Sequence, residues 1–311
     1  MSDLFLGIDT SNYRTSAAIV DEKGEIVFNH RELLEVPMGE RGLRQSTAFF
    51  NHVRRLPEVI SGAMEFRDRI KAVAVSERPR PREGSYMPCF TAGYACACEV
   101  ASALGVPLYS TSHQEGHIEA VRYYSEFKDE DDVIFFHFSG GTTEAVYKDE
   151  IIGGTLDIAL GQVLDRVGVK LGYAFPSGSI MDAIAMDAEG SSSYLTPVKV
   201  KNGYMNLSGI ETQAVRKAEE LAADGRPTDL LIREIFDKLG RAISDMTKEL
   251  TEKCGNRPVI YAGGVSSSEY IRGQLRKTLP EDLRYVFGTG ELSGDNAVGV
   301  ALIGMKSYRM R

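Results

Sequence analysis

A repeated pattern of strands restricts the folds that this sequence can adopt. Residues 4–28, LFLGIDTSNYRTSAAIVDEKGEIVF, contain three apolar runs separated by short turns, which predicts three consecutive strands. The pattern returns in residues 133–156, VIFFHFSGGTTEAVYKDEIIGGTL, and each copy is followed by helical stretches and a further apolar strand, at 70–76 and 257–266. Chance similarity between two hairpins is the alternative. Two copies of one unit with intervening helices predict an α/β protein whose two lobes face each other across a cleft.

The acidic segment 126–132, EFKDEDD, is the expected connection between the lobes. We therefore predict an N-terminal lobe at 1–127 and a C-terminal lobe at 128–311. The net charge of -8 argues against tight electrostatic binding of nucleic acid without help from other subunits. No apolar run reaches membrane-spanning length, and the N-terminus has an acid where a signal peptide needs basic residues. We expect a cytoplasmic protein with no membrane partner.

The two equivalent turns carry groups that can bind a phosphate. In FSGGTTE, Gly140 and Gly141 allow backbone N–H groups to approach an anion, and Thr142 adds a hydroxyl. The first turn, DTSNYRTS, offers hydroxyls at positions 10, 11 and 15 for the same purpose. A third pair, Gly263 and Gly264, follows a strand and opens a helix, which is typical of a nucleotide site at a helix N-terminus. Together these elements resemble the duplicated nucleotide-binding fold of the actin, hexokinase and Hsp70 superfamily.

Two of the five histidines, His113 and His117, lie four residues apart in SHQEGH. Ser112 is a predicted helix N-cap with Glu115 as its capping-box partner, so the helix should begin at His113. Residues four apart lie on one helix face, and the two rings can therefore point at a single metal ion. A zinc protease is improbable, because its glutamate directly follows the first histidine, whereas Glu115 is two residues on. The other reading is a solvated or capping pair of histidines.

Several motifs in order extend the comparison to nearly the whole chain. HQEGH, SGGTTE, GQVLDRVGVKLGYAFPSG, YMNLSG, AGGVSSS and SGDNAVGVALIG resemble those of the tRNA threonylcarbamoyladenosine transferase family, formerly called the O-sialoglycoprotein endopeptidase family. The resemblance implies that His113, His117 and Asp295 bind one iron or zinc ion. Some relatives add a tyrosine two residues before the S-G-G motif, and this chain has His137 there. We expect His137 to be a further ligand; a core histidine satisfied by backbone carbonyls is the alternative.

The resemblance also implies contacts to an adenine nucleotide, which would be threonylcarbamoyl-AMP, AMP or ATP. Asp165 in VLDRVG matches the acid that binds the ribose, and Gly178 matches one of two glycines at the nucleotide, the other being replaced by Ser177. Ser268 stands where relatives usually have an asparagine near the adenine or ribose. For Asp165 a solvated helix acid is the alternative, and for Gly178 an ordinary turn glycine.

Two segments depart from the family pattern. The first turn has Tyr13 and Arg14 where relatives commonly carry acids, so a negative or neutral patch becomes basic. The usual G-P-G segment is replaced by SERPRPREGSYM, residues 76–87, which is either a stiff solvated loop or one that contacts an anion or RNA. These departures leave the acceptor of the reaction open.

The resemblance implies a metal-assisted acyltransferase that moves a threonylcarbamoyl group from threonylcarbamoyl-adenylate to N6 of the adenosine beside the tRNA anticodon. tRNA is then a substrate, and an inactive paralogue and a small P-loop ATPase are possible partner subunits. One alternative is a paralogous carbamoyltransferase with another acceptor. A nucleotide-binding scaffold without activity is the other, although it should have lost the metal ligands that this chain retains.

Overall fold

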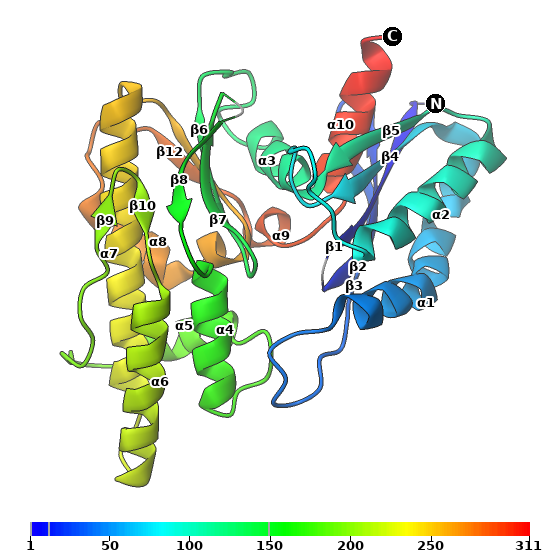
Figure 1. Ribbon diagram of the computed structural model, residues 1–311. Coiled ribbons are helices and arrows are strands. Elements are labelled where there is room, and N and C mark those ends of the chain that lie inside the picture. The colour runs from blue at the N-terminus through cyan, green and yellow to red at the C-terminus, as the bar shows by residue number, and fades with distance from the viewer. Residues whose placement is uncertain (1, 12, 149) are drawn as a thin grey trace. The chain divides into compact units, whose positions relative to one another are not determined.

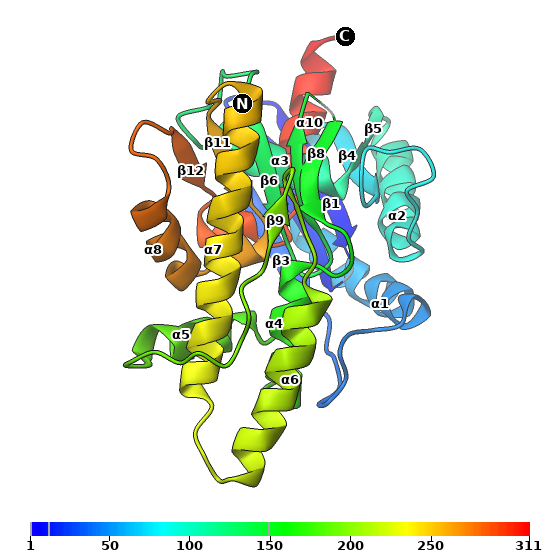
Figure 2. The same cartoon turned by 60° about the vertical axis from the view of Figure 1, so that its left-hand side comes forward.

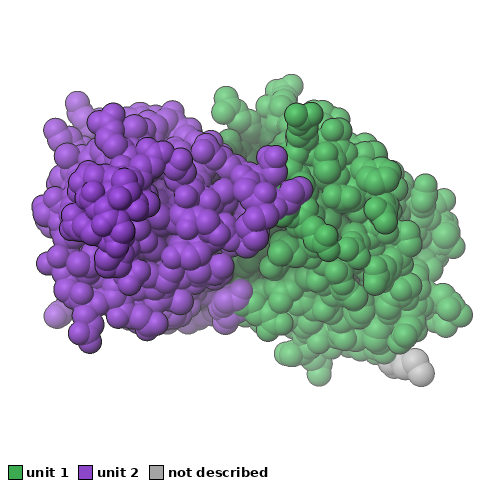
Figure 3. Space-filling view, turned by 90° about the horizontal axis from the view of Figure 1, so that it is seen from below, with its two compact units in different colours: residues 1–36, 42–124, 291–311 green, residues 37–41, 125–290 purple. Residues whose placement is uncertain are grey.

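The computed structural model describes residues 2–11, 13–148 and 150–311 (Figure 1). It divides into two compact units, coloured separately in Figure 3. Unit 1 comprises residues 1–36, 42–124 and 291–311, and unit 2 comprises residues 37–41 and 125–290. The division differs from the expected boundary at residue 127 mainly because the segment 291–311 returns to unit 1.

Unit 1 is built on a five-stranded sheet with the order β3-β2-β1-β4-β5. The three strands of the predicted hairpins are antiparallel, whereas β4 pairs in parallel with both β1 and β5. The strands are β1 (Leu4–Ser11), β2 (Arg14–Asp21), β3 (Ile26–Leu33), β4 (Ile70–Arg78) and β5 (Leu108–Ser112).

Helices cover both faces of this sheet (Figure 1). Leu4, Leu6 and Ile8 of β1 pack with α1 (Gln45–Ala63) and α2 (Cys89–Leu104), whereas Phe5 packs on the other face with α3 (His113–Tyr123) and α10 (Val298–Arg309). Every residue of β1 is consequently buried. The 3₁₀ helix η1 (Met64–Arg69) leads from α1 into β4.

The C-terminal helix belongs to unit 1 because it packs directly on β1. Gly7 permits this approach, since a Cβ atom there would lie 2.5 Å from both the Ala297 carbonyl oxygen and the Ala301 nitrogen. The sequence pattern of α10 is apolar and resembles that of many core helices, so it did not indicate which sheet the helix covers.

Unit 2 repeats the arrangement of unit 1 and extends it. Its sheet has the order β12-β11-β6-β7-β8-β10-β9, in which β6, β7 and β8 are antiparallel neighbours and β11 pairs in parallel with β6 and β12. The predicted duplication is therefore confirmed. The strands are β6 (Ile134–Phe138), β7 (Thr143–Tyr147), β8 (Glu150–Thr155), β9 (Val200–Lys201), β10 (Tyr204–Met205), β11 (Val259–Ala262) and β12 (Tyr285–Phe287).

A long helix, α7 (Asp229–Cys254), supplies much of the unit 2 core, and α6 (Ser208–Ala223) runs beside part of it (Figure 2). None of the helices in the described ranges is long and apolar enough to cross a membrane. The remaining helical elements are α4 (Leu160–Lys170), α5 (Gly178–Asp187), η2 (Gly264–Ser267), α8 (Glu269–Thr278) and the short α9 (Gly290–Ser293).

Candidate functional site

The N-terminus of α3 positions the two histidines of the HQEGH motif. Helix α3 begins at His113, and Ser112 caps it: the Glu115 N–H donates to the Ser112 hydroxyl (3.2 Å), and the Ser112 N–H donates to the Glu115 carboxylate (2.8 Å). The predicted capping box is confirmed. The capped first turn fixes the start of the helix, so His113 and His117 lie one turn apart on one face.

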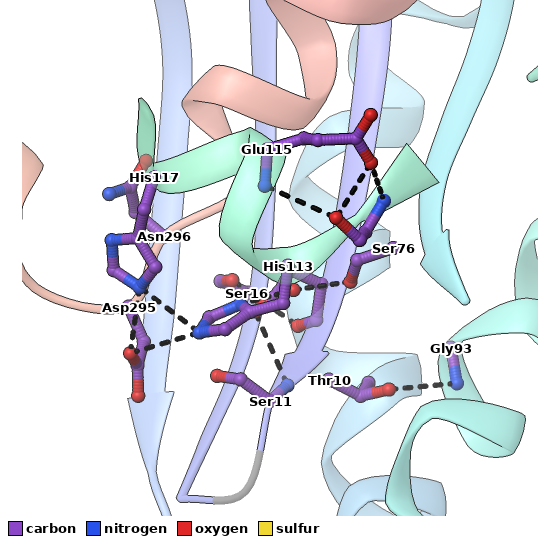
Figure 4. A network of polar contacts seen from close by, with 12 residues as sticks. Thr10, Ser11, Ser16, Ser76, Gly93, His113, Glu115, His117, Asp295 and Asn296 are labelled. Carbon is purple, nitrogen blue, oxygen red and sulfur yellow. Dashed lines mark hydrogen bonds and ion pairs between the residues drawn. The ribbon is translucent and has the colours of Figure 1, made fainter. Parts of the chain in front are cut away.

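Asp295 completes a compact cluster with these histidines (Figure 4). The Nε2 atoms of His113 and His117 are 3.0 Å apart, and Asp295 Oδ1 lies 3.4 Å from His113 Nε2 and 3.2 Å from His117 Nε2. Ligand atoms of a tetrahedral zinc ion are about 3.3 Å apart, given bonds of about 2.0 Å. Two imidazoles and one carboxylate at these separations fit the coordination shell of a single divalent ion.

Asn296 holds the segment that carries Asp295. Its side-chain amide donates to the carbonyls of Leu292 (3.0 Å) and Gly294 (2.7 Å), and its carbonyl oxygen accepts from the Val298 N–H (2.9 Å). This residue was not singled out in the sequence. Its position two residues before an apolar helix was the available signal, because asparagine side chains commonly bond the backbone two residues on where a chain turns.

Asp9 is a second residue that the sequence interpretation missed. Its side chain is completely buried in β1, and its Oδ1 lies 2.9 Å from Nδ1 of His113. The Ser76 hydroxyl donates to the same oxygen, and the Ser11 N–H donates to Oδ2 (3.2 Å). The sequence signal for Asp9 was an acid inside the apolar run LFLGID, because a buried carboxylate requires hydrogen-bond or charge partners.

The charges of this cluster are strongly coupled. Burial opposes the imidazolium, but the negative charges of Asp9 and Asp295 raise the pKa of His113 to about 10. Burial likewise opposes the carboxylate of Asp295, yet hydrogen bonds from His113 and His117 hold its pKa well below the usual value. Burial and the charge of His113 lower the pKa of His117. A metal ion would replace the proton on His113, because a ligating imidazole must be neutral.

His137 lies in β6 of unit 2, paired with Glu144 of β7 and Ala262 of β11. Its side chain is buried. Among the described residues, the metal-type cluster consists of His113, His117 and Asp295. Ligation by His137 therefore stays a prediction.

Two glycine turns of unit 2 lie at the ends of neighbouring strands. Gly140, Gly141 and Thr142 connect β6 to β7, while Gly263 and Gly264 follow β11, which is parallel to β6. Gly263 has φ +93°, and a Cβ atom there would lie 2.4 Å from the Phe138 carbonyl oxygen. Both turns thus sit at the same edge of the sheet, where ligands of α/β proteins commonly bind.

Asp165 of α4 lies near the first of these turns. Its Oδ1 accepts from the Ser177 N–H (2.8 Å), and a Cβ atom on Gly140 would lie 3.9 Å from its Oδ2. Burial raises the pKa of Asp165 to about 6, although the N–H groups of Ser177 and Gly178 counteract this shift. The structure therefore groups Gly140, Asp165 and Gly178, the last at the start of α5.

Ser268 caps a helix of unit 2. It is the N-cap of α8, where its hydroxyl accepts from the Ile271 N–H (3.1 Å) and donates to Asp182. A contact from Ser268 to a nucleotide stays a prediction.

The departures from the family pattern are both in unit 1. Arg14 is the first residue of β2. Burial lowers the pKa of Arg31, and the positive charge of Arg14 lowers it further. The loop after β4 borders a hollow of about 610 Å³ lined in part by Arg82, Tyr86 and Tyr94. The Gln114 N–H donates to the Pro79 carbonyl (3.0 Å), which ties this loop to α3.

Comparison with known proteins settles the family. Residues 36–302 match the tRNA N6-adenosine threonylcarbamoyltransferase family. The chain belongs to this family. It is 27% identical over 307 residues to the tRNA N6-adenosine threonylcarbamoyltransferase of Neorickettsia sennetsu, covering 96% of this chain and 92% of the relative. A probable bifunctional tRNA threonylcarbamoyladenosine biosynthesis protein of Methanothermobacter thermautotrophicus is also 27% identical, over 99% of this chain and 56% of its own length.

A solved structure of another protein has a fold similar to that of this family member. A ROK family glucokinase from Streptomyces griseus, in complex with glucose and AMPPNP, has a TM-score of 0.54 at 16% identity and covers 97% of this chain and 99% of its own. The expected duplicated fold of the actin, hexokinase and Hsp70 type is thereby confirmed.

Proposed function

We propose that this chain transfers a threonylcarbamoyl group to N6 of the adenosine beside the anticodon of tRNA, with one divalent ion bound by His113, His117 and Asp295. The family match over residues 36–302 carries the proposal, because it contains all three of these residues. The paralogous carbamoyltransferase and the inactive scaffold are not favoured, since this match is to a transferase family.

The reaction is an acyl transfer. The N6 amine attacks the carbamoyl carbon of threonylcarbamoyl-adenylate, the bond from that carbon to the phosphate oxygen breaks, AMP leaves and N6 loses a proton. The amine of adenine is a poor nucleophile, so positioning and carbonyl activation must provide most of the acceleration. A bound divalent ion would supply Lewis acidity toward the carbonyl or adjacent oxygens.

The donor set favours iron or zinc over magnesium. Two imidazole nitrogens and a carboxylate suit a borderline metal, whereas magnesium prefers oxygen ligands. We include His137 as a further nitrogen ligand, on the basis of its position before the Gly140–Gly141 turn. A metal-loaded crystal structure tests this: a His137 nitrogen well beyond about 2.5 Å from the ion would make it a core histidine.

Unit 2 would hold the adenylate. Backbone N–H groups of Gly140, Gly141 and Gly264 would surround the phosphate, and the Asp165 carboxylate would accept from the ribose hydroxyls. Thr142, Gly178, Gly263 and Ser268 complete the proposed nucleotide site. The grouping of Gly140, Asp165 and Gly178 supports this assignment.

The net charge of -8 supports a requirement for other subunits in holding tRNA. We propose an inactive paralogue and a small P-loop ATPase as the partners, and the cytoplasm as the location.

Reconstitution tests the proposal. The chain, loaded with Zn²⁺ or Fe²⁺, is incubated with the donor-forming enzyme, threonine, bicarbonate, ATP and unmodified tRNA, with and without candidate partners. Nucleoside mass spectrometry should detect threonylcarbamoyladenosine, and Asp295→Ala should abolish it. No modified nucleoside with any partner combination, in the presence of bound metal, would contradict the proposed acceptor.

A further inference from the structure

We propose that Asp9 is a positioning residue of the metal site: its carboxylate accepts a hydrogen bond from Nδ1–H of His113 and thereby presents the Nε2 lone pair of that ring to the ion. The proposal rests on the metal-binding part of the proposed function. It concerns metal affinity and imidazole geometry, so it can be tested without any assay of transfer to tRNA.

The first argument is the fixed position of the Asp9 carboxylate (Figure 4). Asp9 is fully buried, and its two oxygens accept from Ser76, from the Ser11 N–H and from His113. Ser76 and the Ser11 N–H hold the carboxylate in place, so it can orient the His113 ring that contacts it. Ser16 donates instead to the backbone carbonyl of Asp9 (3.2 Å).

The second argument is the orientation of the His113 ring. Nδ1 lies 2.9 Å from Asp9 Oδ1, while Nε2 lies 3.0 Å from His117 Nε2 and 3.4 Å from Asp295 Oδ1. One edge of the imidazole thus contacts Asp9 and the other edge points into the ligand cluster. Neutral imidazole has one N–H, and a carboxylate acceptor at Nδ1 places it there.

The third argument is the burial of Asp9 itself. An ionised carboxylate without solvent exposure is unfavourable unless it is paired. Asp9 lies outside the described cluster whose ligand atoms converge, so it acts on the ion through His113. A carboxylate in this outer position raises the basicity of a ligating imidazole.

Asp9→Asn is the principal test, because it keeps the side-chain shape and removes the charge. Zn²⁺ affinity is measured by chelator competition on folded protein, and the visible absorption spectrum is recorded with Co²⁺. We expect Zn²⁺ binding to weaken about 10- to 100-fold and the Co²⁺ bands to shift. Ser16→Ala is the matched control: it removes a hydrogen bond to the Asp9 backbone and should leave affinity and spectrum as in the parent.

A purely structural role for Asp9 predicts a different outcome. Asp9→Asn and Ser16→Ala would then both lower thermal stability, with Zn²⁺ affinity within about twofold of the parent and unchanged Co²⁺ bands, a result that would overturn the proposal. Absence of Zn²⁺ and Co²⁺ binding by the parent would overturn it together with the proposed metal site. Loss of transfer to tRNA alone would leave it standing.

A measurement on the parent covers the case in which Asp9→Asn does not fold. ¹⁵N NMR of the histidine side chains in the Zn²⁺-loaded protein, assigned with His113→Gln, should show His113 protonated at Nδ1 and metal-bound at Nε2. Metal on Nδ1, or no slowly exchanging Nδ1 proton, would refute the role of Asp9.

Discussion

The turn after β1 in unit 1 and the turn after β6 in unit 2 occupy equivalent places in two copies of one topology, yet they differ in chemistry. In unit 1 the Thr10 hydroxyl donates to the Cys89 carbonyl (3.0 Å) and accepts from the Gly93 N–H (3.1 Å), while the Thr15 hydroxyl lies 2.8 Å from His52 Nδ1. In unit 2 a Cβ atom on Gly141 would meet no heavy atom within 4 Å. The first turn is used to bind helices, and the second leaves room for a ligand.

The difference shows how duplication can separate two tasks. In the unit 1 copy, Thr10 bonds to α2, while the Asp9 side chain joins the cluster of His113, His117 and Asp295. Glycines in the unit 2 copy leave backbone N–H groups near the surface, where an anion can approach. The sequence led us to expect that both turns can bind phosphate. In the first turn, two of the three hydroxyls already bond to protein partners, so they are less available to a phosphate.

The largest expected effect comes from breaking the unit 1 cluster. Asp295→Ala should reduce bound Zn²⁺ from about one ion per chain to nearly none, because the site loses its carboxylate ligand. Metal analysis after dialysis measures this, and AMP titration should be unaffected. Glu291→Ala, which removes an exposed acid from the same segment, is the control. Equal metal content in Asp295→Ala and parent would refute the cluster as a metal site.

A second variant breaks the unit 2 turn. Gly263→Val should lower the free energy of unfolding by about 3 kcal/mol or more and abolish AMP binding, because it combines a positive φ with a clash against the Phe138 backbone. Gly264→Ala is the control, since a Cβ atom there meets no heavy atom within 4 Å and should change stability by about 0.5 kcal/mol at most. Denaturant unfolding and calorimetry provide both readouts.

Asp165 of unit 2 should make the stability of the protein depend on pH. Because its pKa is raised to about 6 from 3.8, the folded state binds more protons between these values, and stability falls as pH rises through this window. Asp165→Asn should therefore increase unfolding free energy by about 1–3 kcal/mol above pH 6 and have little effect below pH 4. AMP binding should weaken about tenfold with loss of a charged ribose acceptor. A variant that is no more stable than the parent at pH 7 would contradict this account of the site.

His52 gives unit 1 a pH dependence of stability with the opposite sign. Burial lowers its pKa to about 4 from 6.5 against the opposing charge of Asp9, so the unfolded state binds more protons in this range and stability rises with pH. His52→Gln should flatten this rise by about 1–2 kcal/mol. An unaltered pH profile in His52→Gln would mean that its ring is not held neutral.

The sequence predicted most of the architecture because the signals were local. Alternating apolar runs marked both hairpin sets, and the Ser112–Glu115 capping box located the start of α3. The roles of Asp9 and Asn296 were missed, since their partners are distant in the sequence or belong to the backbone. Likewise, no local pattern in α10 indicated which sheet it covers, because this depends on the close approach of the helix to Gly7 of β1. Long-range packing is what a one-dimensional pattern lacks.

The discontinuity of unit 1 has a consequence for how an ion would act on folding. His117 and Asp295 are 178 residues apart in the chain, with nearly all of unit 2 between them. An ion held by both would serve as a removable cross-link that closes a very long loop, and its binding free energy would be added to the folding of unit 1. Chelation would then loosen the attachment of α10 to β1 and leave the core of unit 2, which lies within residues 125–290, intact.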